Sequence, residues 1–140
     1  MLAVANNSKA GTARKTILIV DDEFGILEVL ESILEDSGYK VMSAVNGRDA
    51  LTRLKKSVPD LVIVDFMMPL LDGAGVINAM RANKKLHAVP VILASALPEK
   101  AIGERCTGYQ AFLRKPFKIE RLMEEISRLL DGSSSDSTSS

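Results

Sequence analysis

The sequence contains a single cysteine, Cys106, so an internal disulfide bond is excluded. The lack of cystines fits a reducing compartment, although many proteins from oxidising compartments also lack them. We interpret Cys106 as a buried or half-buried small side chain rather than as a reactive thiol.

The sequence also lacks an excess of charge of one sign and a long apolar run. Lys and Arg total 18, and Asp and Glu total 18, so the net charge gives no sign of a surface for nucleic acid or anionic membranes. No apolar run approaches the roughly 20 residues that cross a bilayer. Residues 2–5 are apolar but are followed by polar residues, so a signal-peptide core is absent. The sequence therefore predicts a soluble, cytoplasmic protein that binds neither membranes nor nucleic acid directly.

The two ends of the chain differ from its centre in composition. Residues 1–14 mix small and polar types without a period, which predicts a flexible leader. Residues 132–140 are nearly all serine, and such a segment has no apolar surface to bury. We interpret it as a disordered tail or as the start of a linker, and we place one domain over residues 15–131.

Within that domain, short apolar runs alternate with stretches in which apolar residues recur at helical spacing. One such stretch begins with Phe24, and another has Val76, Ile77 and Met80 as its expected buried side. This order predicts a doubly wound α/β fold of the (βα)5 flavodoxin-like type, a five-stranded parallel sheet with helices on both faces. The expected strands span residues 16–20, 39–44, 61–64, 89–94 and 111–113. The expected helices span residues 24–37, 47–56 with Asn46 as cap, 74–82, 98–106 and 119–130, the fourth being weak because Gly103 interrupts it.

Polar side chains follow the ends of four expected strands: Asp21 and Asp22, Asp65, Ser95 and Lys115. In parallel sheets, ligands bind at the carboxyl ends of the strands. Carboxylates gathered there repel one another, raise one another's pKa and require a cation. Oxygen ligands favour Mg²⁺ over Zn²⁺, and Mn²⁺ is also acceptable. Any one acid, Asp22 above all, could instead cap the helix that follows it, but the whole set favours a metal site.

Four segments carry a resemblance to a known family: ILIVDDE from residue 17, LVIVDFMMPLLDG from residue 61, LASA from residue 93 and LRKPF from residue 113. Together they resemble the CheY-like receiver domains of response regulators in two-component signalling. The resemblance covers about residues 15–131, with the segments in the family's order.

The resemblance implies that Asp65 accepts a phosphoryl group from a sensor histidine kinase or a phosphotransfer protein. It implies that Asp22, Asp65 and the backbone carbonyl of Met67 hold Mg²⁺, with Asp21 acting mainly through a bound water. Such a domain is a switch rather than a conventional enzyme, because it catalyses only its own phosphorylation and a slow dephosphorylation. Its output passes to a downstream protein or to a further domain.

The resemblance assigns the remaining polar positions as well. Lys115 would neutralise charge on the phosphoryl oxygens, and Ser95 would hydrogen-bond the new group and move toward it. Phe112 would be the switch aromatic that turns inward behind Ser95, although ordinary core packing explains a phenylalanine there equally well. The peptide bond before Pro116 is a candidate for the cis form.

Three features depart from the family pattern or limit what it implies. Met67 and Leu97 occupy the two variable positions beside the phosphoryl group, and neither apolar side chain can orient a water for hydrolysis. The segment between Ser95 and Lys115 is slightly shorter than is common. His87 lies in a polar connection, and we interpret it as a solvated loop residue rather than as a relay histidine.

Other classes fit the residues less well. A phosphatase of the haloacid-dehalogenase class needs a second acid two residues after the nucleophile, where this chain has Met67. A flavodoxin-type cofactor binder needs a phosphate-binding loop where Asp21 and Asp22 would repel an anion. A non-phosphorylated pseudo-receiver that only binds partners stays open. Within the receiver interpretation, so does the choice between a stand-alone regulator and a piece of a larger regulator or hybrid kinase.

Overall fold

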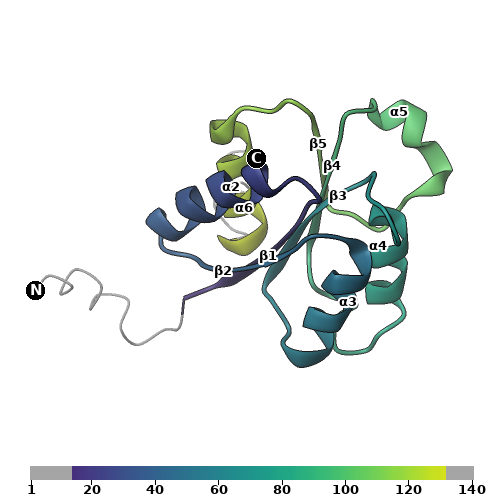
Figure 1. Ribbon diagram of the computed structural model, residues 1–140, viewed down its shortest axis with the longest axis horizontal. Helices are drawn as coiled ribbons and strands as arrows, with labels where there is room; N and C mark the ends of the chain where they lie inside the picture. The colour runs from purple at the N-terminus through teal and green to yellow at the C-terminus, as the bar shows by residue number, and fades with distance from the viewer. Residues whose placement is uncertain (1–13, 132–140) are drawn as a thin grey trace, which may run out of the picture.

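The computed structural model describes residues 14–131 (Figure 1). Apart from Arg14, the expected leader and the serine-rich tail therefore lie outside the described residues. The strands are β1 (Thr16–Val20), β2 (Lys40–Ala44), β3 (Leu61–Asp65), β4 (Val91–Ser95) and β5 (Ala111–Arg114). The helices are α2 (Phe24–Asp36), α3 (Gly47–Lys56), α4 (Gly73–Arg81), α5 (Glu99–Ile102), the 3-10 turn η1 (Gly103–Arg105) and α6 (Ile119–Asp131).

All five strands pair in parallel in the order β2-β1-β3-β4-β5, which confirms the predicted doubly wound sheet. The order reverses direction at β1, because the chain first adds a strand on one side of β1 and then continues on the other. A reversal of this kind leaves a crevice at the carboxyl ends of the two central strands. Here these strands are β1 and β3, with Val20 opposite Val64.

The two faces of the sheet support two separate apolar cores, because successive side chains of a strand point to opposite faces. On one face, Leu18 and Val20 pack with the buried sides of α3 and α4 and with Ile102. On the other face, Ile17 and Ile19 pack with the buried sides of α2 and α6. Figure 1 shows α2 and α6 on one side of the sheet and α3 and α4 on the other. Within the described residues, no helix combines the length and apolarity needed to cross a membrane.

Two expectations about the elements need correction. Strand β4 begins at Val91 rather than at residue 89, because Pro90 has no N–H for the ladder and contributes only its carbonyl, which accepts from Val62. Phe24 matched the helical spacing of apolar residues in α2, yet its side chain is 69% exposed. Helix side chains lean toward the helix N-terminus, so the first residue of α2 leans past the end of the core.

The expected weak helix at residues 98–106 is confirmed as the shortest α-helix of the described chain. It comprises only α5 and η1, and Gly103 at the junction has a φ of 54°. Ile102 and Cys106 anchor this short segment in the core, and burial raises the pKa of the Cys106 thiol to about 11. Cys106 is therefore a buried, protonated side chain, as the sequence predicted.

Candidate functional site

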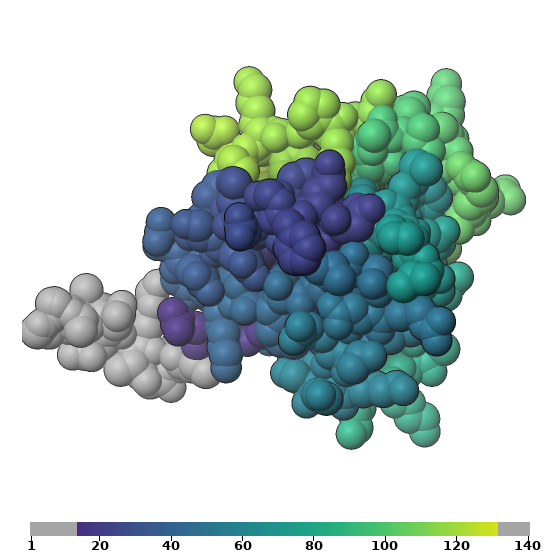
Figure 2. Space-filling view, viewed as in Figure 1, coloured from purple at the N-terminus to yellow at the C-terminus, as the bar shows by residue number. Residues whose placement is uncertain are grey.

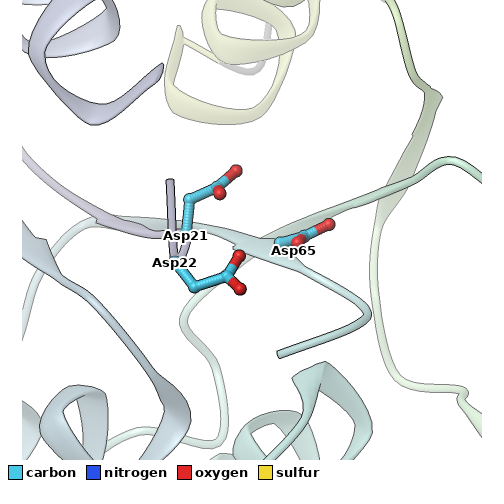
Figure 3. A group of neighbouring side chains, drawn as sticks. All are labelled: Asp21, Asp22 and Asp65. Atoms are coloured by element: carbon cyan, nitrogen blue, oxygen red, sulfur yellow. The ribbon is translucent and has the colours of Figure 1, made fainter. Parts of the chain in front are cut away.

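Three carboxylates converge at the carboxyl ends of β1 and β3. Asp21 and Asp22 directly follow β1, and Asp65 is the last residue of β3. Because β1 and β3 are neighbours, one carboxylate oxygen from each of the three residues lies within 4.8 Å of the others (Figure 3). The structure thus brings together all three acids that the sequence singled out.

Lys115, which directly follows β5, reaches into this cluster. Its Nζ lies 2.9 Å from Oδ2 of Asp21 and 3.3 Å from Oδ1 of Asp65. Its backbone N–H donates to the carbonyl of Ser95, so the chain leaving β5 is fastened to the end of β4. The Lys115–Pro116 peptide bond is cis, as expected. One ammonium is therefore shared between two carboxylates of the cluster.

The environment of Asp65 disfavours its charged form. The pKa of Asp65 is raised to about 6, first because burial desolvates the carboxylate and second because Asp21 and Asp22 lie nearby. Lys115 opposes this shift without cancelling it. The like-charge repulsion expected from the sequence is present, but burial is the larger cause. Three acids with one shared ammonium have unbalanced negative charge, and their oxygen donors suit a hard divalent cation.

Asp21 and Asp22 have different local roles. Oδ1 of Asp21 accepts a hydrogen bond from the backbone N–H of Glu23, and Asp21 is only 4% exposed. Asp22 is exposed, and α2 has Glu23 as its N-cap residue with no side-chain capping hydrogen bond. The helix-capping interpretation of Asp22 is therefore wrong. Its carboxylate points toward the cluster instead (Figure 3).

Ser95 and Phe112 lie on the last two strands of the sheet, β4 and β5. Ser95 ends β4 and is 1% exposed, and its Oγ accepts a hydrogen bond of 2.9 Å from the N–H of Leu97. Phe112 lies opposite Leu93 on β4 and is half-buried, with its ring 6.2 Å from that of Tyr109. The two candidate switch residues thus lie on the strands that come directly before and after the α5–η1 segment in the chain.

The other candidate residues lie around the mouth of the site or away from it. Met67 lies on the loop between β3 and α4 with its side chain 61% exposed, whereas Leu97 is half-buried against the core. His87 is an exposed loop residue, as predicted. Sequence analysis missed Leu70, whose unusual backbone conformation on the same loop leaves no pattern in the sequence.

Residues 17–127 match the family model described as the response regulator receiver domain. The chain belongs to this family. The receiver domain of a signal transduction histidine kinase from Syntrophus aciditrophicus is 35% identical and superposes with a TM-score of 0.79, over 86% of this chain and 92% of that one. The same architecture, a CheY-like fold, is present in both.

Curated relatives of this receiver domain include longer regulators. The transcriptional regulatory protein PrrA of Mycobacterium tuberculosis is 36% identical over 134 residues, which cover 93% of this chain and 56% of PrrA. The response regulator Rre1 of Synechocystis is 38% identical over 120 residues, which cover 82% of this chain and 51% of Rre1. The chain therefore spans about half the length of these relatives.

One solved relative of the receiver domain was determined with a bound metal ion. The response regulator TrrA of Thermotoga maritima, in complex with Mg²⁺ and BeF, is 34% identical with a TM-score of 0.75, over 83% of this chain and 99% of that one.

Proposed function

We propose that this receiver domain accepts a phosphoryl group on Asp65 and thereby switches between two conformations. The observation that carries the proposal is the placement of Lys115 beside Asp65, within a cluster of three acids at the switch point of the sheet. The Asp65 carboxylate has its pKa raised to about 6, so it still ionises near neutral pH and can act as a nucleophile.

The residues of the cluster fit Mg²⁺, or Mn²⁺ in its place. Asp22, Asp65 and the backbone carbonyl of Met67 would hold the ion, and Asp21 would act mainly through a bound water. The ion, when bound, supplies positive charge to the phosphoryl oxygens during an in-line transfer. The convergence of the three carboxylates and the Mg²⁺-containing relative from Thermotoga maritima support this assignment.

The transfer itself needs few protein groups. A carboxylate oxygen of Asp65 attacks the phosphorus atom as its bond to the donor's histidine nitrogen breaks, and that nitrogen retains the electron pair. An acyl phosphate on Asp65 results. The ammonium of Lys115 then has a phosphoryl oxygen to contact in place of the carboxylate oxygen that lies 3.3 Å away. Positioning and charge account for most of the catalysis in such transfers.

Ser95 and Phe112 would carry the signal away from the site. The Ser95 hydroxyl accepts a hydrogen bond from Leu97, so its own proton is available to a phosphoryl oxygen. Its movement toward that oxygen would free space into which the half-buried Phe112 ring turns. The added charge would thus bias the face formed by β4, β5 and α5 toward a second arrangement.

The partners follow from the family and from the length of the relatives. The donor would be a sensor histidine kinase or a phosphotransfer protein, in the cytoplasm. The output would pass to a downstream protein or to a further domain, and residues 15–131 would form the receiver unit between a leader and a linker. In this proposal the domain catalyses its own phosphorylation and a slow dephosphorylation, and no other reaction.

Intact mass spectrometry after incubation with acetyl phosphate tests the proposal. We expect one added phosphoryl group in the wild type with Mg²⁺, and none without Mg²⁺ or in Asp65→Asn. Asp36→Asn is the matched control, because Asp36 is an exposed acid at the end of α2, and it should be labelled like the wild type. Labelling that persists in Asp65→Asn would place the acceptor elsewhere. No labelling of a wild type that binds Mg²⁺ would favour a pseudo-receiver.

A further inference from the structure

A side-chain hydrogen bond joins the two ends of the segment that contains α5 and η1. Oη of Tyr109 donates to Oε2 of Glu99 at 2.7 Å. Glu99 is the first residue of α5, and Tyr109 lies two residues before the start of β5. In Figure 2 the α5–η1 segment (green) lies at the upper right edge of the molecule. The bond therefore ties a helix at the edge of the fold to the chain that enters the sheet.

The Tyr109 hydroxyl is a persistent donor. Its pKa is raised to about 12, first because burial disfavours the phenolate and second because Glu99 accepts its hydrogen bond. The phenol therefore keeps its proton throughout the physiological range of pH. A separation of 2.7 Å between a hydroxyl and a carboxylate oxygen is that of a charge-assisted hydrogen bond.

Tyr109 also contacts the candidate switch aromatic, Phe112. The two ring centroids lie 6.2 Å apart with the ring planes tilted by 48°, a separation typical of interacting aromatic pairs. Both rings and the Leu97 side chain are half-buried and pack against the core on the α3–α4 face of the sheet. The room available to the Phe112 ring therefore depends on where the Tyr109 ring is held.

Glu99, at the other end of the hydrogen bond, lies close in sequence to Ser95. Only residues 96–98 separate the two. The backbone N–H of Leu97, in the middle of this connection, donates to Oγ of Ser95 at 2.9 Å. A connection of three residues has little slack, so a displacement of Ser95 toward the acid cluster is passed on to the first turn of α5.

The chain on both sides of Tyr109 is anchored to α4, at Arg81. Nε and Nη2 of Arg81 donate to the carbonyl oxygen of Gly108 at 3.0 and 2.7 Å. Nη2 also donates to Oε1 of Gln110 at 3.1 Å. Helix α5, by contrast, comprises four residues and has no side-chain capping hydrogen bond at its N-terminus. Tyr109 is therefore the fixed partner of the hydrogen bond, and the start of α5 is the partner that can move.

We propose that the Glu99–Tyr109 hydrogen bond holds α5 and the Phe112 ring in the unphosphorylated arrangement, which makes Glu99 and Tyr109 positioning residues of the switch. This inference rests on the proposed phosphorylation of Asp65. As Ser95 moves toward a phosphoryl oxygen, Glu99 moves with it and the hydrogen bond breaks. The released Tyr109 ring then gives the Phe112 ring room to turn inward. A bond that only the unphosphorylated arrangement contains lowers the population of the activated one.

The rate at which acetyl phosphate labels the full chain in Mg²⁺ tests this inference. Stable labelling requires Ser95 beside the phosphoryl group, so the rate follows the population of the activated arrangement. Tyr109→Phe removes only the donor hydroxyl, and Glu99→Ala removes the acceptor. Glu99→Gln keeps an acceptor oxygen. Tyr39→Phe is the matched control, because the Tyr39 hydroxyl forms a hydrogen bond with Ser127 of α6 in the core on the other face of the sheet.

We expect Tyr109→Phe and Glu99→Ala each to be labelled about threefold faster or more, the effect of one hydrogen bond that opposes activation. The double variant should gain no more than either single variant, because both changes remove the same bond. Glu99→Gln and Tyr39→Phe should be labelled at about the wild-type rate. The affinity for Mg²⁺ alone should be the same in all five variants, because the ion's acids are unchanged.

Three results would overturn the inference while leaving Asp65 as the acceptor. The first is a labelling rate of Tyr109→Phe that equals or falls below that of the wild type, which is the result expected of a bond that only stabilises the fold and whose loss lowers the melting temperature. The second is additive gains in the double variant. The third is an equal gain in Tyr39→Phe. Failure of acetyl phosphate to label wild-type Asp65 would instead refute the proposed function itself.

Discussion

Nζ of Lys115 lies 2.9 Å from Oδ2 of Asp21, although 94 residues separate the two in the chain. Asp21 is 4% exposed, so its carboxylate depends on this ammonium for charge compensation. The same ammonium lies 3.3 Å from Asp65. The contact thus ties the end of β5 to the end of β1 across the site at which we propose the chemistry takes place.

Replacement of Lys115 by alanine should destabilise the protein in EDTA by about 1–3 kcal/mol, because the buried Asp21 carboxylate loses its cation. Mg²⁺ should restore part of this loss by supplying charge to the same acids. Urea denaturation with and without Mg²⁺ measures both effects. Lys118→Ala, at an exposed position just before α6, should change little. Equal stability of the two variants in EDTA would contradict the compensating role of Lys115.

The stability of the metal-free protein should fall as the pH rises through the titration of Asp65. The folded-state pKa of Asp65 is about 6, above the ordinary 3.8, so the folded protein binds this proton more tightly than the unfolded chain. The corresponding stabilisation is complete below about pH 4 and is lost as the pH rises through about 6.

Asp65→Asn should remove this pH dependence, and in EDTA it should be more stable than the wild type at pH 8 by about 2 kcal/mol. At pH 4 the two proteins should be closer in stability. Urea denaturation at the two pH values measures the difference. If the variant is no more stable than the wild type at pH 8, the surroundings of Asp65 do not disfavour its charged form, and the prediction is wrong.

The phosphorylated form should lose its phosphoryl group slowly, over hours rather than minutes. Met67 is exposed but apolar and Leu97 is half-buried and apolar, so neither side chain can hold a water in line with the phosphorus atom. Met67→Asn should shorten the lifetime several-fold, because an amide can orient such a water. Intact mass measured over time after removal of acetyl phosphate gives both rates. Wild-type decay within minutes at physiological temperature would refute this prediction.

Gly47→Ala should destabilise the protein by more than about 2 kcal/mol, because the new Cβ would overlap the backbone carbonyl of Leu71. Gly25→Ala is the matched control in α2, where a Cβ would meet nothing within 4 Å. That substitution should stabilise the helix by up to about 1 kcal/mol. Thermal denaturation of both variants tests the contact, and a Gly47→Ala protein as stable as the wild type would contradict it.

The order of elements and the faces of the sheet could be predicted from the sequence. Ile17 to Val20 form a continuous apolar run because β1 is buried on both faces, which is the pattern of a central parallel strand. The helical spacing of Val76, Ile77 and Met80 likewise identified the buried side of α4. Phe24 matched the same kind of pattern and is exposed, because spacing alone does not show where a core ends.

The sequence also predicted which residues lie at the candidate site. Parallel strands bring their carboxyl ends to one edge, so the residues after β1, β3, β4 and β5 had to be neighbours once the topology was known. The sequence did not reveal which neighbours touch. It could not show that Lys115 lies nearer to Asp21 than to Asp65, because that depends on side-chain conformations and on the direction of the chain after β5.

By itself, the sequence determined the doubly wound sheet and the set of acids, hydroxyl and lysine at its edge, because both depend on periodicity and on strand order. Only the tertiary structure decided the raised pKa of Asp65, whose largest cause is burial by residues distant in sequence. Only the tertiary structure decided the positive φ and the exposed position of Leu70, because the next residue, Leu71, packs closely against Gly47 of α3 and Gly75 of α4. Desolvation and packing between elements act across the fold, so they leave no periodic signal along the chain.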